Sequence, residues 1–547
     1  MYHLFSKNIR LYKLLLLCFF IYIFFLRIHN LSSRTFELWD EGWYFSSAGS
    51  ALVFIDYLRK TNYNFLCDSF EIGKLRETVR ANAPVPFGGD SKPVFSVVLL
   101  IGLLIGGFDQ FSIFFEMIII SLITMYFVYL IGSYIFSIEI GTMSALFFGM
   151  SGIMTYFSRS CMPQMVMVLF CMISFYASLR ITERRIMLVI FPISSVLAFF
   201  THPATGPLLI IFWLYAIGSI LRKKINLKTN LSIIFINFLV SAILFIFIAE
   251  LPKLAFSDHL GHGEYVGYFE NINLRSNASN STYFKTIYEL QFLLSNLWES
   301  EFLIILFSII GAIILIIRYP TKYEIILLIA PITFILIYFF LGISYRFRIF
   351  IVIYPFIHII GGLGFVKSYK FLSSFFYKYK IYIKILYTTF LVIIIFQGLN
   401  LSISFENSNK EVFSRICAGI DDYLSRLPRS EKREISFYQG DISTWFYYYF
   451  TEKRLYQLYP SLLNSMIWDW RKHRPFLPDY GDFIIAVEDS ENGCRSYRMS
   501  KNEFSKIIDG KKQIMSIPFE HISRCDDYTK TTFNKKMVLL KVYDLKS

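Results

Sequence analysis

Long apolar runs, separated by short polar or basic connectors, fill most of the first 400 residues. A run of about 20 apolar residues is long enough to cross a bilayer as a helix. We assign eleven such segments, at residues 11–28, 111–135, 139–157, 164–180, 186–200, 204–221, 231–250, 299–317, 324–342, 348–366 and 381–398. The pattern predicts a mostly α, polytopic membrane protein of about 11–13 transmembrane helices.

The apolar run 94–107 is short for a span and more typical of an interfacial helix. If it does not cross, the basic connectors and the N-terminus share one side of the membrane. The cations on that side are Lys7, Arg10, Lys13, Arg180, Arg184, Arg185, Arg222, Lys223, Lys224, Lys228, Arg318, Lys322, Lys367, Lys370, Lys378, Lys380 and Lys384. Because basic connectors stay in the cytoplasm, we prefer this topology, with a cytoplasmic N-terminus.

Three large segments then face the extracytoplasmic side. They are a first outer loop at 29–93 that carries interfacial helices, a second outer loop at 251–298, and the region 399–547. We therefore divide the chain into a transmembrane domain, 1–398, and an extracytoplasmic domain, 399–547.

The C-terminal region is polar and contains strand-like runs at 482–487 and 536–545, with a helical candidate at 409–427. This mixture predicts a soluble α/β domain of ordinary size. Cys494 and Cys525 both lie there, on an oxidising face, so a disulfide and two free thiols are both open alternatives.

The composition agrees with a membrane protein. The chain of 547 residues is 55% hydrophobic and 17% charged, with a mean hydropathy of +0.50. The net charge of +14 serves topology and lipid head groups, and we expect no nucleic-acid partner. We expect a multi-pass protein of the plasma membrane, in a bacterium the inner membrane.

Two adjacent acids, Asp40 and Glu41, follow the first predicted span directly. The other outer connectors carry cations close to helix ends. Ionisable groups at membrane boundaries are costly, so their convergence on one face indicates a functional site. Cations can hold a phosphate there, and a carboxylate can remove a proton from an acceptor.

Several motifs recur in a characteristic order: "WDEGWY", "SKPVF", "FDQFS", "YFSRSCMPQMVMVLF" and "YRFRIFIVIYPFIHIIGGLG". In this order they resemble the GT-C glycosyltransferases, in particular the glycosyltransferase family 39-like group of protein O-mannosyltransferases and the lipid A aminoarabinose transferase. Those enzymes use a polyprenyl-phosphate-linked sugar on the extracytoplasmic side. The resemblance covers roughly residues 1–400 and does not include the C-terminal region.

The resemblance implies roles for individual residues. The family's acidic motif falls on Asp40 and Glu41, with the first acid as catalytic base. The family's phosphate-binding positions fall on Lys92 before Pro93, on Arg348 seven residues before Pro355 with Arg346 as its neighbour, and on Arg159 after Ser158. Where many relatives have an acid five residues after that arginine, this chain has Gln164. No DxD-type pair indicates a divalent cation, so we assign no cofactor or metal, although a cation remains open.

Each candidate also has a structural interpretation. The acids suit a helix start, the arginines suit snorkelling anchors, and Lys92 suits an interfacial anchor. Arg159 suits a structural ion pair, and His202 in "THPAT" suits a helix cap. The glycines around His259, His262 and Glu264 suit a mobile loop that could act as a lid. These three residues and Tyr345 are the further candidates for substrate contact.

The function expected is transfer of one monosaccharide from a polyprenyl-phosphate donor to a hydroxyl acceptor, with inversion, by an EC 2.4-type enzyme. The acceptor is a glycan, a lipid or a protein. The alternatives are a lipid-linked sugar transporter or flippase and a non-catalytic membrane scaffold of an envelope glycan pathway. Transporters carry polar residues near the bilayer midplane, whereas the predicted spans look apolar there, which favours the enzyme.

Overall fold

The structure is a computed structural model, and it describes part of the chain. The described residues are 2–31, 44, 45, 48, 55, 92–107, 110–222, 227–256, 301–318, 320–341, 347–404, 426, 437–438, 483–489, 493–494, 508–522 and 535–544. Most of the three predicted outer segments lies outside these residues.

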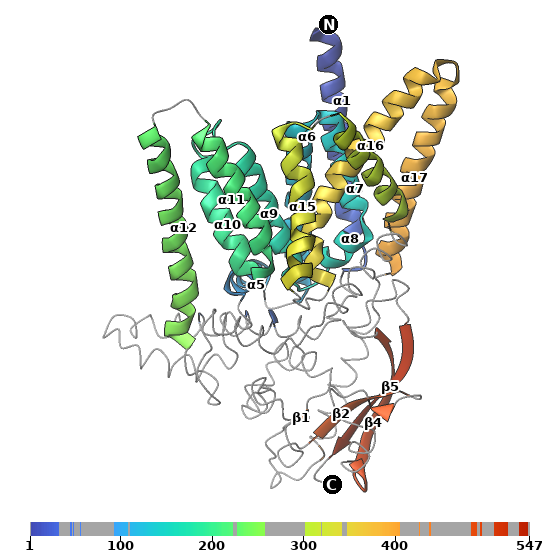
Figure 1. Cartoon of the computed structure of the whole chain (residues 1–547). Helices are drawn as coiled ribbons and strands as arrows, with labels where there is room; N and C mark the ends of the chain where they lie inside the picture. The colour runs from blue at the N-terminus through green and yellow to red at the C-terminus, as the bar shows by residue number, and fades with distance from the viewer. Residues whose placement is uncertain are drawn as a thin grey trace.

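A bundle of helices forms the larger part of the fold (Figure 1). Its elements are α1 (Tyr2–Ile28), α5 (Pro93–Gly106), α6 (Gln110–Ile135), α7 (Ile138–Met150), α8 (Gly152–Ser158), α9 (Gln164–Leu179), α10 (Met187–Thr201), η3 (Pro203–Thr205), α11 (Gly206–Leu221), α12 (Leu227–Phe256), the helix Glu301–Ile317, α15 (Lys322–Leu341), η4 (Phe347–Ile353), α16 (Tyr354–Phe375), η5 (Tyr377–Tyr379) and α17 (Lys380–Ser404). Within the described residues, six helices are long and apolar enough to cross a membrane, or seven if the bent pair α7–α8 is one span.

All eleven predicted segments coincide with helices, which confirms a polytopic, mostly helical fold. Two predictions need correction. The segment 139–157 is not one straight helix, because it bends by 64° between α7 and α8 at Ser151. The segment 348–366 begins as the 3₁₀ helix η4, and α16 then continues to Phe375. At the bend, the side chain of Ser151 accepts a hydrogen bond from the backbone N–H of Met154 and starts a new helix, which hydropathy does not report.

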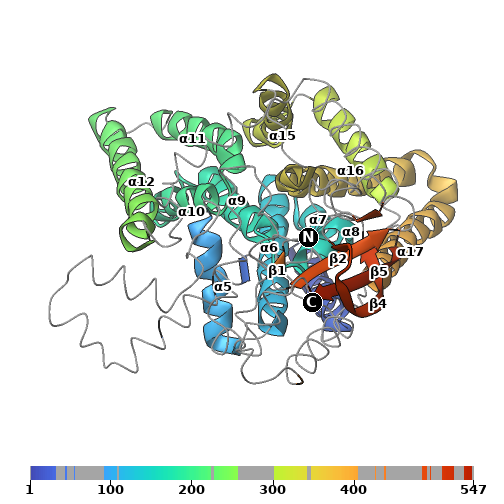
Figure 2. The same ribbon diagram turned by 90° about the horizontal axis from the view of Figure 1, so that it is seen from below.

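The two ends of the bundle differ. The N-terminus and the α16–α17 connection lie at the upper end in Figure 1, whereas α5 and the C-terminal strands lie at the lower end. Helix α5 therefore begins and ends at one end of the bundle, as expected for a run that does not cross. Seen from below in Figure 2, α12 lies at the rim beside α10 and α11, with which it packs.

Helices in the bundle centre approach closely through small residues. A methyl group at Gly311 would meet the carbonyl oxygen of Ile360 at 2.1 Å, and one at Gly364 would meet the carbonyl oxygen of Phe307 at 1.9 Å. The hydroxyl of Ser308 also donates across this contact to the carbonyl of Ile357 at 2.8 Å. Small residues of this kind let helix backbones touch inside a membrane.

The C-terminal region contains a five-stranded sheet of β1 (Phe437–Tyr438), β2 (Phe483–Asp489), β3 (Gly493–Cys494), β4 (Lys512–Ile522) and β5 (Lys535–Asp544). The order is β1-β2-β5-β4, with β3 on β2, and β5 is antiparallel to both β2 and β4. The two predicted strand-like runs are therefore strands. The helical candidate 409–427 is described only at residue 426 and Cys525 lies outside the described residues, so the α/β domain and the disulfide stay predictions.

Candidate functional site

Lys92 lies at the start of α5, directly before a proline that is well suited to the first helical position. Its side chain is 5% exposed. The ammonium group donates a hydrogen bond to the hydroxyl of Tyr44 and lies 4.6 Å from the centre of that ring. Tyr44 in turn packs edge-on against Phe95, with ring centres 5.1 Å apart. The charge of Lys92 is thus buried against an aromatic face, which disfavours a simple interfacial anchor.

Arg159 is the C-cap of α8 and is 1% exposed. Its backbone N–H donates to the carbonyl of Tyr156 at 3.0 Å, which ends the helix. Its guanidinium donates to the carbonyl of His29 at 2.9 Å, just after the end of α1. Arg159 therefore connects the end of α8 to the end of α1, at the point where the chain leads toward the acid pair.

His202 caps two helices at once. It ends α10 and begins η3, and its Nδ1 accepts a hydrogen bond from the backbone N–H of Ala204 at 3.2 Å. The side chain is 8% exposed. This geometry agrees with the helix-cap interpretation. Its contact with substrate stays a prediction.

Gln164 occupies the position where many relatives carry an acid. It begins α9, is 1% exposed, and its side-chain carbonyl oxygen accepts no hydrogen bond from any described residue. Arg348 lies in η4, and the structure describes its backbone only. Its predicted role at the phosphate therefore stays a prediction.

The remaining candidates lie outside the described residues. They are Asp40, Glu41, His259, His262, Glu264, Tyr345 and Arg346. Among the described residues no three His, Cys, Asp or Glu side chains form a potential metal site. The acid pair and the histidine loop lie outside the described residues, so a bound cation at the site and a metal-free site both stay open.

The sequence analysis missed a group of buried ionisable side chains within the bundle. Arg27, Glu301 and His358 are 0%, 2% and 0% exposed, respectively. Of these, only His358 lies in the middle of a predicted span, 348–366, and it departs from the expectation of apolar midplanes. Arg27 and Glu301 lie near the ends of the predicted spans 11–28 and 299–317, where they read as boundary residues, and only helix packing shows that they are buried.

Arg27 and Glu301 lie on either side of the break between α7 and α8. Arg27 donates to the hydroxyl of Ser121 and to the carbonyl of Gly149 at 3.2 Å, near the C-terminal end of α7. Glu301 accepts a hydrogen bond from Ser151, which begins α8. A cation at a helix C-terminus and an anion near a helix N-terminus both interact favourably with the helix dipole, so each stabilises its helix end.

A second charged cluster lies in the α9–α10 connection. Arg180 Nε donates to Glu183 at 3.0 Å, and the hydroxyl of Tyr134 donates to the same carboxylate. Burial raises the pKa of Glu183, but hydrogen bonds from Tyr134 and Arg180, together with the charges of Arg180 and Arg184, bring the pKa below its ordinary value. This cluster ties α6 to the turn that follows α9.

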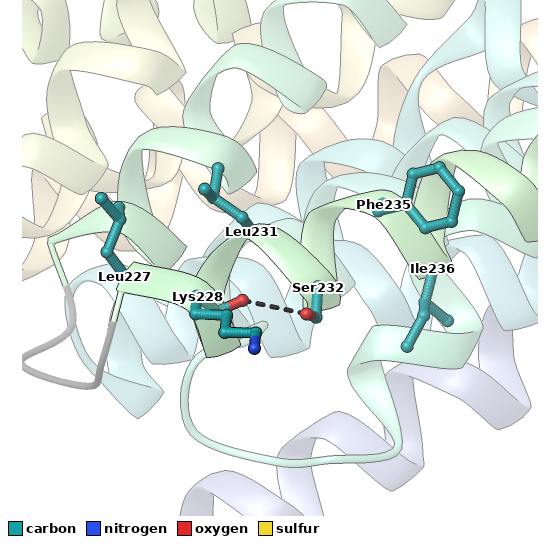
Figure 3. A pocket seen from close by; sticks show the side chains of 6 residues that line it. All are labelled: Leu227, Lys228, Leu231, Ser232, Phe235 and Ile236. Atoms are coloured by element: carbon teal, nitrogen blue, oxygen red, sulfur yellow. Dashed lines mark hydrogen bonds between the residues drawn. The ribbon is translucent and has the colours of Figure 1, made fainter.

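An open groove of about 810 Å³ runs along the outer face of α12 (Figure 3). It is lined by Leu227, Lys228, Leu231, Ser232, Phe235 and Ile236. The groove begins at the start of α12. It includes none of the candidate residues, so it does not identify the reaction site.

Comparisons with known proteins support the motif-based resemblance. A family model described as dolichyl-phosphate-mannose-protein mannosyltransferase matches residues 90–249. The crystal structure of ArnT from Cupriavidus metallidurans bound to undecaprenyl phosphate is 11% identical, with a TM-score of 0.53, and the match covers 96% of this chain and 97% of that one. This chain therefore shares its fold with that ArnT.

The apo structure of the same ArnT gives a similar match, with 10% identity, a TM-score of 0.50 and 98% coverage of both chains. The curated proteins contain no match to this chain. The sequence motifs placed the resemblance in roughly the first 400 residues, whereas the structural match extends over nearly the whole chain. The structural alignment therefore extends beyond the residues that carry the motifs.

Proposed function

We propose that this GT-C protein transfers one sugar from a polyprenyl-phosphate donor to a hydroxyl acceptor on the extracytoplasmic face, with inversion at the anomeric carbon. Three observations support the proposal. The fold is shared with an ArnT that binds undecaprenyl phosphate, the matching family model is that of a lipid-phosphate-sugar transferase, and two cations, Lys92 and Arg159, are buried where chain segments leave the bundle.

The acid pair supplies the proton chemistry in this proposal. Asp40 accepts the proton of the acceptor hydroxyl as the oxygen attacks the anomeric carbon. Glu41 orients the acceptor or holds a cation near the site. The bond between the anomeric carbon and the donor phosphate breaks on the opposite face, which gives inversion. The phosphate leaves as an anion, and it needs no proton if nearby cations stabilise its negative charge.

Cationic side chains stabilise the negative charge of the departing phosphate in this proposal. Lys92, Arg159, Arg346 and Arg348 are the proposed ligands of the donor phosphate, since preorganised cations stabilise charge that develops in the transition state. The observation that carries this assignment is the burial of Lys92 and Arg159, because a buried cation is preorganised and its desolvation favours an anionic partner.

The loop 251–298 is proposed to close over the site and exclude water, as catalytic lids do. Within it, His259, His262 and Glu264 would contact donor or acceptor, together with Tyr345 and with His202 at the η3 cap.

The test begins with the donor. Mass spectrometry of lipid-linked sugars in cells that lack the protein should show one polyprenyl-phosphate sugar accumulating. Membranes containing Asp40→Asn should then consume this donor about 10²–10⁴-fold more slowly than wild-type membranes, the range of a lost general base. Asp56→Asn is the control, because Asp56 lies beyond the acid motif. Near-normal turnover by Asp40→Asn would refute the assignment.

A lipid-linked sugar transporter is the second candidate, and one observation favours it. The helix pair α7–α8, with Arg27 and Glu301 on either side of its break, is a feature that transporters use at their binding sites. Proteoliposomes separate the two candidates: a transporter moves the donor across the bilayer without acceptor, and Asp40→Asn would leave that movement unchanged.

The multi-pass protein is proposed to lie in the plasma membrane, in a bacterium the inner membrane, with a cytoplasmic N-terminus and the C-terminal region outside. Reporter fusions at the α16–α17 connection and after residue 547 should report opposite sides of the membrane.

A further inference from the structure

A cluster of three polar side chains is sealed inside the bundle, and the proposed mechanism uses none of them. The cluster consists of Ser151, Glu301 and His358, which are at most 2% exposed. His358 Nε2 lies 3.4 Å from Glu301 Oε2, and Ser151 Oγ donates to Glu301 Oε1. Burying a carboxylate among apolar helices is expensive, so its presence inside a membrane bundle indicates a task.

The cluster lies at the break of the α7–α8 pair. Ser151 is the N-cap of α8, and its hydroxyl oxygen also accepts a hydrogen bond from the backbone N–H of Met154 at 3.3 Å. One hydroxyl therefore holds the first turn of α8 and the carboxylate of Glu301 together. The direction in which α8 leaves the 64° bend depends on where Glu301 is held.

Helix α8 is a short lever that ends at a proposed phosphate ligand. It has seven residues, and Arg159 is its C-cap. Seven residues span about 10 Å, so a change of about 10° in the helix direction moves its far end by about 2 Å. A displacement of that size is enough to take a guanidinium out of hydrogen-bonding range of a phosphate.

His358 completes the connection. It lies one turn into α16, and this helix follows η4, which contains Arg348. The ring of His358 is packed edge-on by Phe148 of α7 and by Tyr354, with ring centres 5.8 Å and 6.1 Å away. The imidazole is therefore fixed in place, and it fixes the carboxylate of Glu301 relative to α16.

We propose that Glu301, held by His358, is a positioning residue that sets Arg159 at the donor phosphate through Ser151 and α8. The inference rests on the proposed function for the role of Arg159. It also has a consequence that needs no ligand, because the thiol of Cys161, two residues beyond Arg159, is fully buried. Loosening the start of α8 should expose this thiol.

The ligand test uses undecaprenyl phosphate as the probe, with binding to the full-length protein measured by native mass spectrometry. Ser151→Ala should weaken binding about tenfold, comparable to losing one hydrogen bond to a charged group. Arg159→Gln should weaken it similarly. In the Arg159→Gln background, Ser151→Ala should have no further effect, because both changes remove the same contact.

Additive losses in the double variant would overturn the inference, since they would show that Ser151 acts through other residues. Unchanged binding in Arg159→Gln alone would instead overturn the proposed role of Arg159. Ser151→Thr, which keeps the hydroxyl, should bind like the wild type, and a loss there as large as that of Ser151→Ala would contradict the hydroxyl-mediated link.

The ligand-free test follows alkylation of cysteines by N-ethylmaleimide, resolved by peptide mass spectrometry. Glu301→Leu and Ser151→Ala should raise the rate at Cys161 severalfold and leave the rate at Cys171, a buried thiol in α9, unchanged. Glu301→Gln, which keeps an acceptor for Ser151, should stay close to the wild type. Equal acceleration at both thiols would indicate general destabilisation, and no acceleration at either would show that the break does not depend on the cluster; either result overturns the inference.

Discussion

Gly364 lies where α16 and the helix Glu301–Ile317 come closest, so Gly364→Ala tests the packing of the bundle directly. The added methyl carbon would lie 1.9 Å from the carbonyl oxygen of Phe307 and 2.7 Å from the backbone nitrogen of Gly311. Both atoms belong to the backbone of the facing helix, which cannot move aside as a side chain does. The two helices must therefore separate by more than 1 Å, an estimate from these contact distances.

The magnitude follows from two opposing effects. Alanine in place of glycine within a helix gains about 0.5–1 kcal/mol, because the unfolded chain loses less freedom on folding. Overpacking of a rigid contact costs about 1–3 kcal/mol. Because the methyl group would also clash with the backbone nitrogen of Gly311, we expect a cost at the upper end of this range. The expected net loss for Gly364→Ala is about 2 kcal/mol.

Gly218→Ala is the matched control. Gly218 is also within a helix, α11, but no atom lies within 4 Å of the position that its methyl carbon would take. This variant should keep or slightly raise stability. With about 1 °C of melting temperature per kcal/mol for a domain of about 400 residues, the two variants should differ by about 3 °C.

The assay is thermal unfolding of the detergent-purified protein, followed by intrinsic fluorescence and by recovery of monodisperse protein. Gly364→Ala should melt below the wild type, and Gly218→Ala at or above it. If Gly364→Ala melts at the wild-type temperature or higher, the backbones of the two helices do not touch, and the packing argument is wrong.

Two further predictions concern electrostatics. The depressed pKa of Glu183 stabilises the protein fully above about pH 4.3, the ordinary carboxyl value, and this contribution is lost as pH falls through the lower folded-state pKa. Glu183→Gln should therefore lower the melting temperature near pH 7 by about 2 °C or less, since the group is partly exposed. The difference from wild type should disappear as pH falls through the lowered pKa of Glu183. Ser232→Ala, a change on α12, should follow the wild type throughout. For Lys92, Tyr44→Phe keeps the ring beneath the ammonium and should weaken undecaprenyl phosphate binding less than Tyr44→Leu, which should lose about tenfold; equal losses would show that the ring face is unimportant.

Much of the fold was predictable because a membrane helix is specified locally. Hydrophobic length alone located all eleven helical segments, and the distribution of lysine and arginine agrees with the way helix ends are grouped in Figure 1. The strands at 482–487 and 536–545 were also visible as alternating or apolar runs. The order of the motifs also predicted the fold that this chain shares with ArnT.

The site was predictable only in part. Residue types and their position at helix ends selected Lys92 and Arg159, but not the aromatic face that holds Lys92 or the bond from Arg159 to the end of α1. His202 could be recognised as a cap, because a histidine before a proline at the end of an apolar run has a local role. The acid pair remains a prediction from the motif.

The amino-acid sequence determined where the helices form, which of their ends are basic, and which family's motifs the chain carries. Only the tertiary structure decided that α7 and α8 are separated by a bend, that Gly364 touches a backbone, and that Glu301 and His358 form a buried pair. The physical reason is the sequence separation over which each interaction acts. Hydropathy and capping act within a few residues, whereas Ser151 and Glu301 are 150 residues apart and meet only when the helices pack.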